Sequence, residues 1–162
     1  MNNSRLEQTL DYITTQLQGI STSDGYRTDP LITRYLASID NIPQYPCIMV
    51  ESGNGEVKPL DTNMTLFDMF VPIALTCFIE GSLSIGDENN LENKYQALLH
   101  DVQRIVASLM LSQVTAQNRF NMNPDKRAFQ FTGLFPMGNM PKGWFTVSFM
   151  IQIRNVGRNF DD

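Results

Sequence analysis

Hydrophobic positions near the start of the chain recur with the period of a helix. Between residues 4 and 20, apolar residues follow one another at steps of three and four, which places them on one helix face. Ser4 and Glu7, three residues later, form the pattern of an N-terminal capping box. A wider apolar stripe with the same spacing predicts a second helix from about residue 90 to residue 112, with either Asn89 or Asn90 as its cap.

Four other stretches carry the composition and alternation of strands. They are rich in Phe, Val, Ile and Thr, or alternate apolar and polar positions, over residues 47–51, 65–80, 129–135 and 144–154. Both faces of the 65–80 segment are mostly apolar, so we expect a central strand or an edge strand covered by a partner. In the last segment, Phe145 and every second residue after it should face the core.

The connecting segments are predicted from turn residues. Residues 31–37 fit either a short helical turn or a short strand, and residues 52–55 fit a hairpin turn. Residues 114–126 should form a long polar loop, and residues 136–143 contain the Pro and Gly of a hairpin connection. Pro72 lacks a donor for a sheet ladder, which predicts a bulge or an unpaired edge near the start of its strand.

The order helix, strand, strand, helix, strand, strand predicts an α+β fold. We expect a mainly antiparallel sheet of about four strands with two amphipathic helices packed on one face. The 162 residues suit one domain, which we place over residues 1–154. Residues 155–162 are polar and are expected to form a loose C-terminal tail.

Composition narrows the classes of protein. Charged residues make up 18% of the chain, below the usual ~25%, which is a first indication of buried subunit contacts. The acidic pI of 4.8 argues against a dedicated nucleic-acid binder. We find neither a signal-peptide pattern nor an apolar stretch of membrane-spanning length, so we expect a soluble protein made in the cytoplasm.

Charge is unevenly distributed along the chain. Residues 1–92 hold 4 Lys/Arg and 13 Asp/Glu, a net charge of -9, whereas residues 93–162 hold 8 and 4, a net charge of +4. One interpretation is chance scatter over a single mixed surface. The other is a pair of oppositely charged faces that meet between subunits in a head-to-tail ring.

Side chains suited to catalysis or metal binding are scarce. His100 is the single histidine and is expected at the rim of the second helix, while Cys47 and Cys77 have apolar neighbours typical of core residues. The acidic residues around Glu88 lack the pattern of a calcium loop and are explained by the dipole of the following helix. We therefore predict no catalytic, cofactor-binding or metal-binding residues, and no enzyme activity.

What remains is a set of possible contact residues. The hairpin link presents methionines and an aromatic residue, which either form a binding surface or fold back on the core. The long loop at 114–126 and its C-terminal flank are basic and aromatic. The candidate protein-interaction residues are Arg119, Phe120, Lys126, Arg127, Met137, Met140, Lys142, Arg154 and Arg158.

A series of segments from about Leu6 to Ile153 follows a distinctive order. An N-terminal helix leads into Asp24-Gly25-Tyr26-Arg27-Thr28-Asp29, and the proline-led strand Tyr45-Pro46-Cys47-Ile48-Met49-Val50-Glu51 follows. Next come Phe78-Ile79-Glu80-Gly81, Leu98-Leu99-His100-Asp101-Val102 and a closing hairpin into Trp144 to Arg154. In the order of these elements, more than in any single motif, the chain resembles the tail terminator proteins of long-tailed bacteriophages.

The resemblance implies a virion protein without catalytic residues that assembles as a homo-hexameric ring. Such a ring caps the head-proximal end of the tail tube, ends tube growth and presents a surface to the head connector or neck protein, and possibly to a sheath protein. DNA would pass through the ring without specific binding, so we expect Arg119, Lys126 and Arg127 to face a neighbour or the tube. Alternatives are another head–tail joining protein, such as a tail-completion or neck subunit, and, more remotely, a non-phage adaptor domain or an enzyme.

Overall fold

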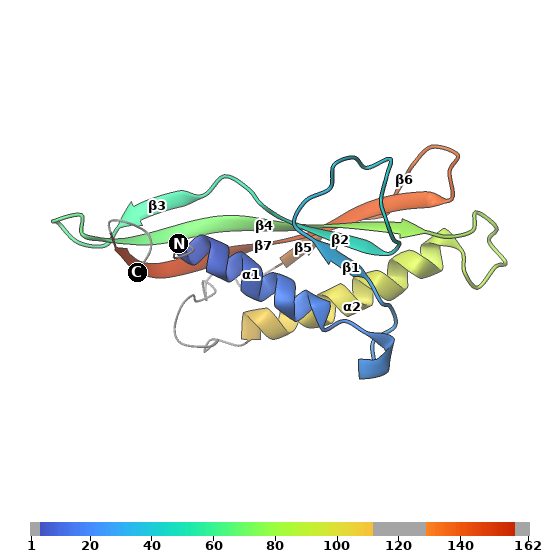
Figure 1. Ribbon diagram of the computed structural model, residues 1–162, viewed down its shortest axis with the longest axis horizontal. Helices are drawn as coiled ribbons and strands as arrows, with labels where there is room; N and C mark the ends of the chain where they lie inside the picture. Colours follow the sequence, from blue (N-terminus) through green and yellow to red (C-terminus); the bar gives the residue numbers. More distant parts are fainter. Residues whose placement is uncertain (1–3, 112–128, 158–162) are drawn as a thin grey trace.

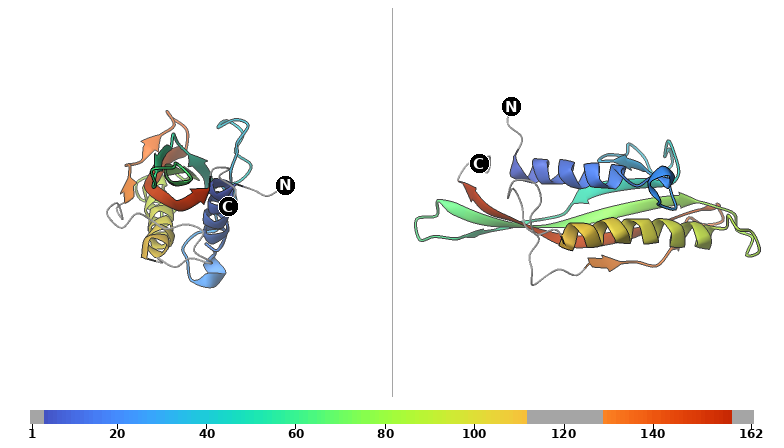
Figure 2. Two further views of the ribbon diagram at one scale, coloured as in Figure 1. Left: turned by 90° about the vertical axis from the view of Figure 1, so that its left-hand side faces the viewer. Right: turned by 90° about the horizontal axis from the view of Figure 1, so that it is seen from below.

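The protein is one twisted sheet with two helices on the same face. The computed structural model describes residues 4–111 and 129–157, with the side chains of residues 110–111 and 154–157 excepted. Viewed end-on, both helices lie on one side of the sheet, and they run side by side in opposite directions (Figure 1, Figure 2). The α+β class and the placement of two helices on one face are therefore as predicted.

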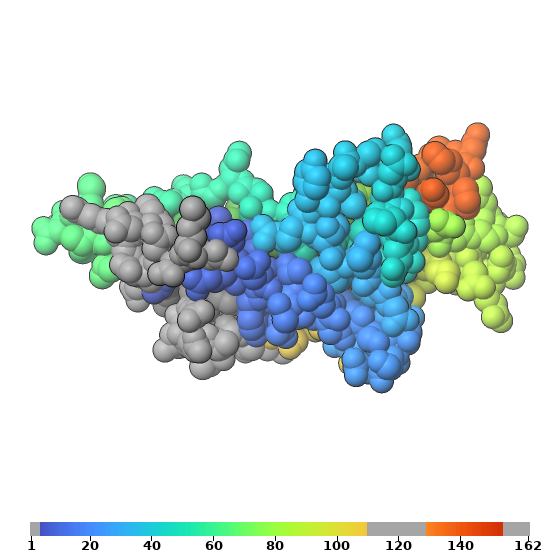
Figure 3. All heavy atoms as spheres, viewed as in Figure 1, coloured from blue at the N-terminus to red at the C-terminus, as the bar shows by residue number. Residues whose placement is uncertain are grey.

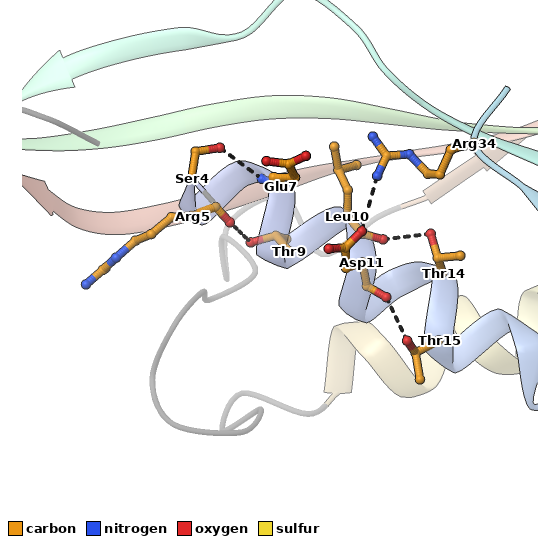
Figure 4. Close-up of polar contacts among 9 residues, drawn as sticks. All are labelled: Ser4, Arg5, Glu7, Thr9, Leu10, Asp11, Thr14, Thr15 and Arg34. Atoms are coloured by element: carbon orange, nitrogen blue, oxygen red, sulfur yellow. Dashed lines mark hydrogen bonds and ion pairs between the residues drawn. The ribbon is translucent and has the colours of Figure 1, made fainter. Parts of the chain in front are cut away.

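Helix α1 (Arg5–Gln18) begins where the capping pattern predicts. The Ser4 hydroxyl accepts a hydrogen bond from the Glu7 backbone N–H at 3.3 Å, which satisfies one of the free donors of the first turn (Figure 4). Asp11 on the exposed side lies 3.6 Å from the Arg34 guanidinium and ties α1 to the segment after the first strand. The opposite face of α1 buries Leu10, Ile13 and Leu17.

Helix α2 (Leu91–Leu111) also starts at its predicted cap. The Asn90 side-chain oxygen accepts from the Asn93 backbone N–H at 2.8 Å. The apolar stripe of α2 packs into the core, and Tyr95 meets Phe145 edge-to-face with ring centroids 4.9 Å apart. His100 lies at the rim of this stripe, with 44% of its side chain exposed, as predicted.

The sheet has more strands than predicted and is mixed. A one-turn 3-10 helix (Thr22–Asp24) precedes the first strand. The strands are β1 (Leu31–Thr33), β2 (Cys47–Ser52), β3 (Glu56–Pro59), β4 (Leu66–Glu80), β5 (Phe129–Phe131), β6 (Phe135–Pro136) and β7 (Lys142–Gly157). Their order is β1-β2-β4-β7-β5, with β3 also on β4 and β6 also on β7. The sheet is mainly antiparallel, as expected, but it has seven strands instead of about four, since β1 adds a parallel pair with β2 and the additional strands are short.

The β4–β7 pair forms the spine of the sheet. Alternate residues of β7 from Phe145 to Ile153 are buried beneath the helices, as the alternation predicts. The pairing extends to Gly157, which lies opposite Leu66. The predicted loose tail over 155–162 was therefore wrong at its start, because residues 155–157 continue β7.

Pro72 lies inside this central strand without a bulge. Its carbonyl accepts from the Gly53 backbone N–H at 2.8 Å, just after β2 ends. The Pro72 nitrogen, which has no hydrogen to donate, therefore points to this same edge of β4. The N–H and C=O of one strand residue point to the same side, so no bond to β7 is lost. The irregularity in the β4–β7 register lies instead between Phe67 and Met69.

The turn at residues 52–55 does not form a hairpin, contrary to the prediction. β2 and β3 do not pair with each other; both pair with β4, one after the other along its length. Gly53 is needed here because a Cβ on it would come within 2.9 Å of the Pro72 ring. The turn therefore moves the chain along one edge of β4.

The two charged halves of the sequence are interleaved in the described fold. β4 belongs to the acidic half and β7 to the basic half, yet they pair from Leu66 to Glu80. Helices α1 and α2, one from each half, lie side by side. Within the described residues, the halves therefore do not form two separate faces.

Candidate interaction site

Residues 24–29 and the Leu98–Val102 segment of α2, far apart in the sequence, are joined by a buried carboxylate. Asp101 on α2 is 0% exposed. Its two oxygens accept from the Arg27 backbone N–H at 3.1 and 3.0 Å, and one also accepts from the Thr28 hydroxyl at 2.6 Å. Since hydrogen bonds to a charged acceptor are stronger than neutral ones, Asp101 fixes residues 24–29 to the helix.

Further contacts hold residues 24–29 in place. The Arg104 guanidinium lies 4.2 Å from the centre of the Tyr26 ring and donates to the Gly25 carbonyl at 3.2 Å. Gly25 has a φ of 84°, which a side chain would disfavour. The segment 24–29, which we call the strap, thus keeps one conformation against α2.

The strap forms one wall of a groove of about 830 Å³ at the end of the sheet where β4 stops and β7 starts. The other walls come from residues 42–46 and from the first turn of α2. The lining residues are Arg27, Thr28, Asp29, Ile42, Pro43, Gln44, Tyr45, Pro46, Ile79, Glu80, Lys94 and Lys142. Five separate segments therefore build this groove.

Three cationic side chains converge on the groove from the strap, α2 and β7. Arg27 and Lys94 form no ion pair within the described residues, and Lys142 lies with its Nζ 5.2 Å from the centre of the Tyr45 ring. The Asp29 carboxylate is already engaged, because it accepts from the Thr22 backbone N–H at 2.8 Å and from the Thr22 hydroxyl. Glu80 is a second carboxylate in the lining, so three cationic groups stand against two acidic ones, and the groove keeps a small excess of positive charge beside its apolar surface.

Replacing Asp29 with asparagine should make the melting temperature less dependent on pH in the acid range. The hydrogen bond from the Thr22 backbone N–H, followed by that from its hydroxyl, lowers the pKa of Asp29 below 3.8. The stabilisation is therefore complete above the unfolded pKa and is lost as pH falls through the lower folded value. Melting temperatures between pH 7 and pH 2 should show the difference between wild type and Asp29→Asn shrinking below about pH 4.

Thr22→Val provides an intermediate for that experiment. It removes the hydroxyl donor and keeps the backbone N–H, so its profile should lie between those of the wild type and Asp29→Asn. A constant difference between wild type and Asp29→Asn across the whole range would contradict the assignment.

The structure places three sequence-predicted contact residues near the hairpin between β6 and β7. Lys142 lines the groove, Met140 is exposed and Met137 is half-buried in the turn, where its N–H donates to the Lys142 carbonyl. Trp144 stacks on Phe135 with ring centroids 4.6 Å apart. Part of the link is therefore exposed and part folds against its own strand, and its role as a binding surface stays a prediction.

The other predicted contact residues fall outside what the structure describes. Arg154 belongs to β7, but its side chain is not among the described ones. Arg119, Phe120, Lys126, Arg127 and Arg158, and with them the predicted loop over 114–126, lie outside the described residues. Their role in contacts stays a prediction.

Sequence reasoning missed most of the groove. Arg27, Lys94 and Tyr45 stand in three segments with no shared periodicity, so only the fold brings them together. The sequence did contain one indication of the strap. It is the presence of both the Gly-Tyr-Arg-Thr-Asp and the Leu-Leu-His-Asp-Val motifs, which Asp101 joins in space.

Groups with reactive potential are few among the described residues. Cys47 and Cys77 are both fully buried, as predicted, and burial raises the pKa of each thiol. No three His, Cys, Asp or Glu side chains gather to hold a metal ion in residues 4–111 and 129–157. Neither described helix is long and apolar enough to cross a lipid bilayer.

Comparison with known proteins adds no assignment. No protein-family model and no curated protein sequence matches this chain. The structure by itself defines the class as an α+β domain with a mixed sheet and a basic, partly apolar groove at one end.

Proposed function

We propose that this chain is a structural subunit of a phage tail terminator ring. In this role six copies cap the head-proximal end of the tail tube, stop its growth and present a surface to the head connector or neck protein. The ring would be made in the host cytoplasm and retained in the virion, with DNA passing through it.

The observation that carries the proposal is the grouping of exposed apolar side chains outside the helices. Among the described residues they occur in four places: after β1, around the β3–β4 turn, in the β4–α2 loop and along β5, β6 and the hairpin. They are Tyr35, Ile39, Val57, Leu60, Met64, Leu66, Leu83, Ile85, Phe131, Phe135 and Met140. Such groups at several sites are typical of a subunit that is covered by neighbours on more than one side.

One of these groups of exposed apolar residues lies on the projecting β3–β4 end of the sheet. Residues 56–68, which we call the arm, extend beyond both helices (Figure 1, Figure 2). Asp61 holds the turn by accepting from the Thr65 backbone N–H at 2.8 Å and from the Thr65 hydroxyl. The arm therefore presents Val57, Leu60 and Leu66, each more than 40% exposed, on a hydrogen-bonded frame. This arrangement suits contact with the tube or with an adjacent subunit.

Tail length is the test of the proposal. Electron microscopy of tails made without this protein should show tubes longer than normal, and supplying the protein should restore a uniform length. Tails of normal length without heads would instead assign it to head–tail joining, the alternative within the same assembly. A stable 18.4 kDa monomer that forms no ring even with tail tube protein would contradict both roles.

A further inference from the structure

The loop between β4 and α2 presents an isoleucine almost completely to solvent. Ile85 is 95% exposed and Leu83 is 58% exposed. Residues 81–90, which we call the knob, form the end of the molecule beyond β4 (yellow-green in Figure 3). A single exposed leucine is ordinary in proteins, but an isoleucine at the tip of a projecting loop indicates a contact surface.

The knob is held together by its own hydrogen bonds. Its two ends are joined where the Ser82 N–H donates to the Asn89 carbonyl at 2.9 Å and the Leu91 N–H donates to the Ser82 carbonyl at 2.8 Å. The Asn90 side-chain amide donates to the Ile85 carbonyl at 3.1 Å. A loop ordered before contact loses little conformational entropy on binding, so its apolar tip is well suited to docking.

The charge of the knob is complementary to that of the groove. Residues 81–90 contain Asp87 and Glu88 and no Lys or Arg. The groove offers Arg27 and Lys94 without ion-pair partners in the described chain, and it adds apolar surface from residues 42–46. Its volume of about 830 Å³ lies in the range of pockets that enclose a drug-sized molecule, which leaves room for the side chain at the tip of the knob.

No residue of the knob lines the groove of its own chain. We propose that the knob of one copy docks in the groove of the next, with Ile85 against the apolar wall and the acidic residues facing Arg27, Lys94 and Lys142. Knob and groove are different surfaces, so a head-to-tail contact between them repeats from copy to copy and forms a ring where the rotation between neighbours closes. The proposal rests on the ring-subunit function and names the surfaces that build the ring.

Two variants that each remove one half of the contact test the proposal. Ile85→Asp disables the knob and keeps the groove, whereas Lys94→Glu with Lys142→Glu reverses the groove charge and keeps the knob. All three side chains are at least partly exposed, so the fold should be retained, which circular dichroism verifies. Thr15→Asp, which places the same charge on the exposed side of α1 outside both surfaces, is the matched control.

Size-exclusion chromatography with light scattering of the purified chains should show assemblies for wild type and Thr15→Asp. Each half-disabled variant alone should run as an 18.4 kDa monomer, with association weakened at least about 30-fold, as for loss of a central contact residue. An equimolar mixture of the two variants should give a species of twice the monomer mass, because one intact knob then meets one intact groove.

Three outcomes would overturn this contact. They are a monomeric wild type, full assembly by Ile85→Asp or by the groove variant, and failure of the two variants to associate when mixed. A failure of the proposed function would give a different result: tails made without the wild-type protein would then have their normal length. If Ile85→Asp protein still forms rings and still limits tail length, the function stands and the knob–groove contact is wrong.

Discussion

Replacing Asp101 with alanine is expected to lower the free energy of unfolding by about 2–4 kcal/mol. The change leaves the Arg27 N–H and the Thr28 hydroxyl without their acceptor. A buried donor that loses its partner costs its desolvation, and here two donors are affected at once. The strap would then be held to α2 by the Arg104 contacts alone, which loosens the wall of the groove that carries Arg27.

Urea unfolding measures the loss, and amide hydrogen exchange locates it. The Arg27 amide should exchange faster in Asp101→Ala, because its acceptor is gone. Asp11→Ala is the control: its carboxylate is exposed and forms a 3.6 Å ion pair with Arg34, so the loss should stay below about 1 kcal/mol. Equal losses in the two variants would show that Asp101 is not the anchor of the strap.

Replacing Phe145 with alanine should cost about 3–5 kcal/mol, the range for truncating a fully buried aromatic residue. Phe145 is 0% exposed in β7, between the sheet and α2. It packs edge-to-face on Tyr95, whose hydroxyl donates to the Thr132 carbonyl at 2.9 Å. The cavity left by alanine would therefore also loosen the contact between α2 and the β5–β6 segment.

Two further variants separate cavity formation from loss of an aromatic ring. Phe145→Leu keeps most of the volume and should cost less than half as much as Phe145→Ala. Phe131→Ala, on the 54% exposed Phe131 of β5, should cost roughly 0.5–1 kcal/mol. The assignment of Phe145 to the core would be wrong if Phe131→Ala and Phe145→Ala had the same midpoint in urea.

Local periodicity explains which elements were predictable. Helices α1 and α2 and the buried face of β7 each repeat a single pattern over ten or more residues, and the caps at Ser4 and Asn90 mark where the helices start. In β3 all four residues are exposed and β1 has three residues, so neither carries a pattern that sequence can show. Their existence depends on β4 and β2 offering an edge with which to pair.

Pro72 shows why pairing could not be predicted at a single position. The residue type predicts that one hydrogen bond to a neighbouring strand is missing. Which neighbour loses that bond depends on what lies on the side of β4 to which the Pro72 nitrogen points. Gly53 occupies the one side and β7 the other, so the proline is accommodated within the central strand.

The sequence by itself determined the α+β class, the two helices with their starts, the alternating face of β7 and the burial of both cysteines. These follow from residues close together in the chain, where periodicity and capping act locally. Only the tertiary structure decided the parallel β1–β2 pair, the bond from Asp101 to the strap and the groove built from five segments. Each of these joins residues far apart in sequence, because burial and charge pairing depend on distances that the folded chain alone sets.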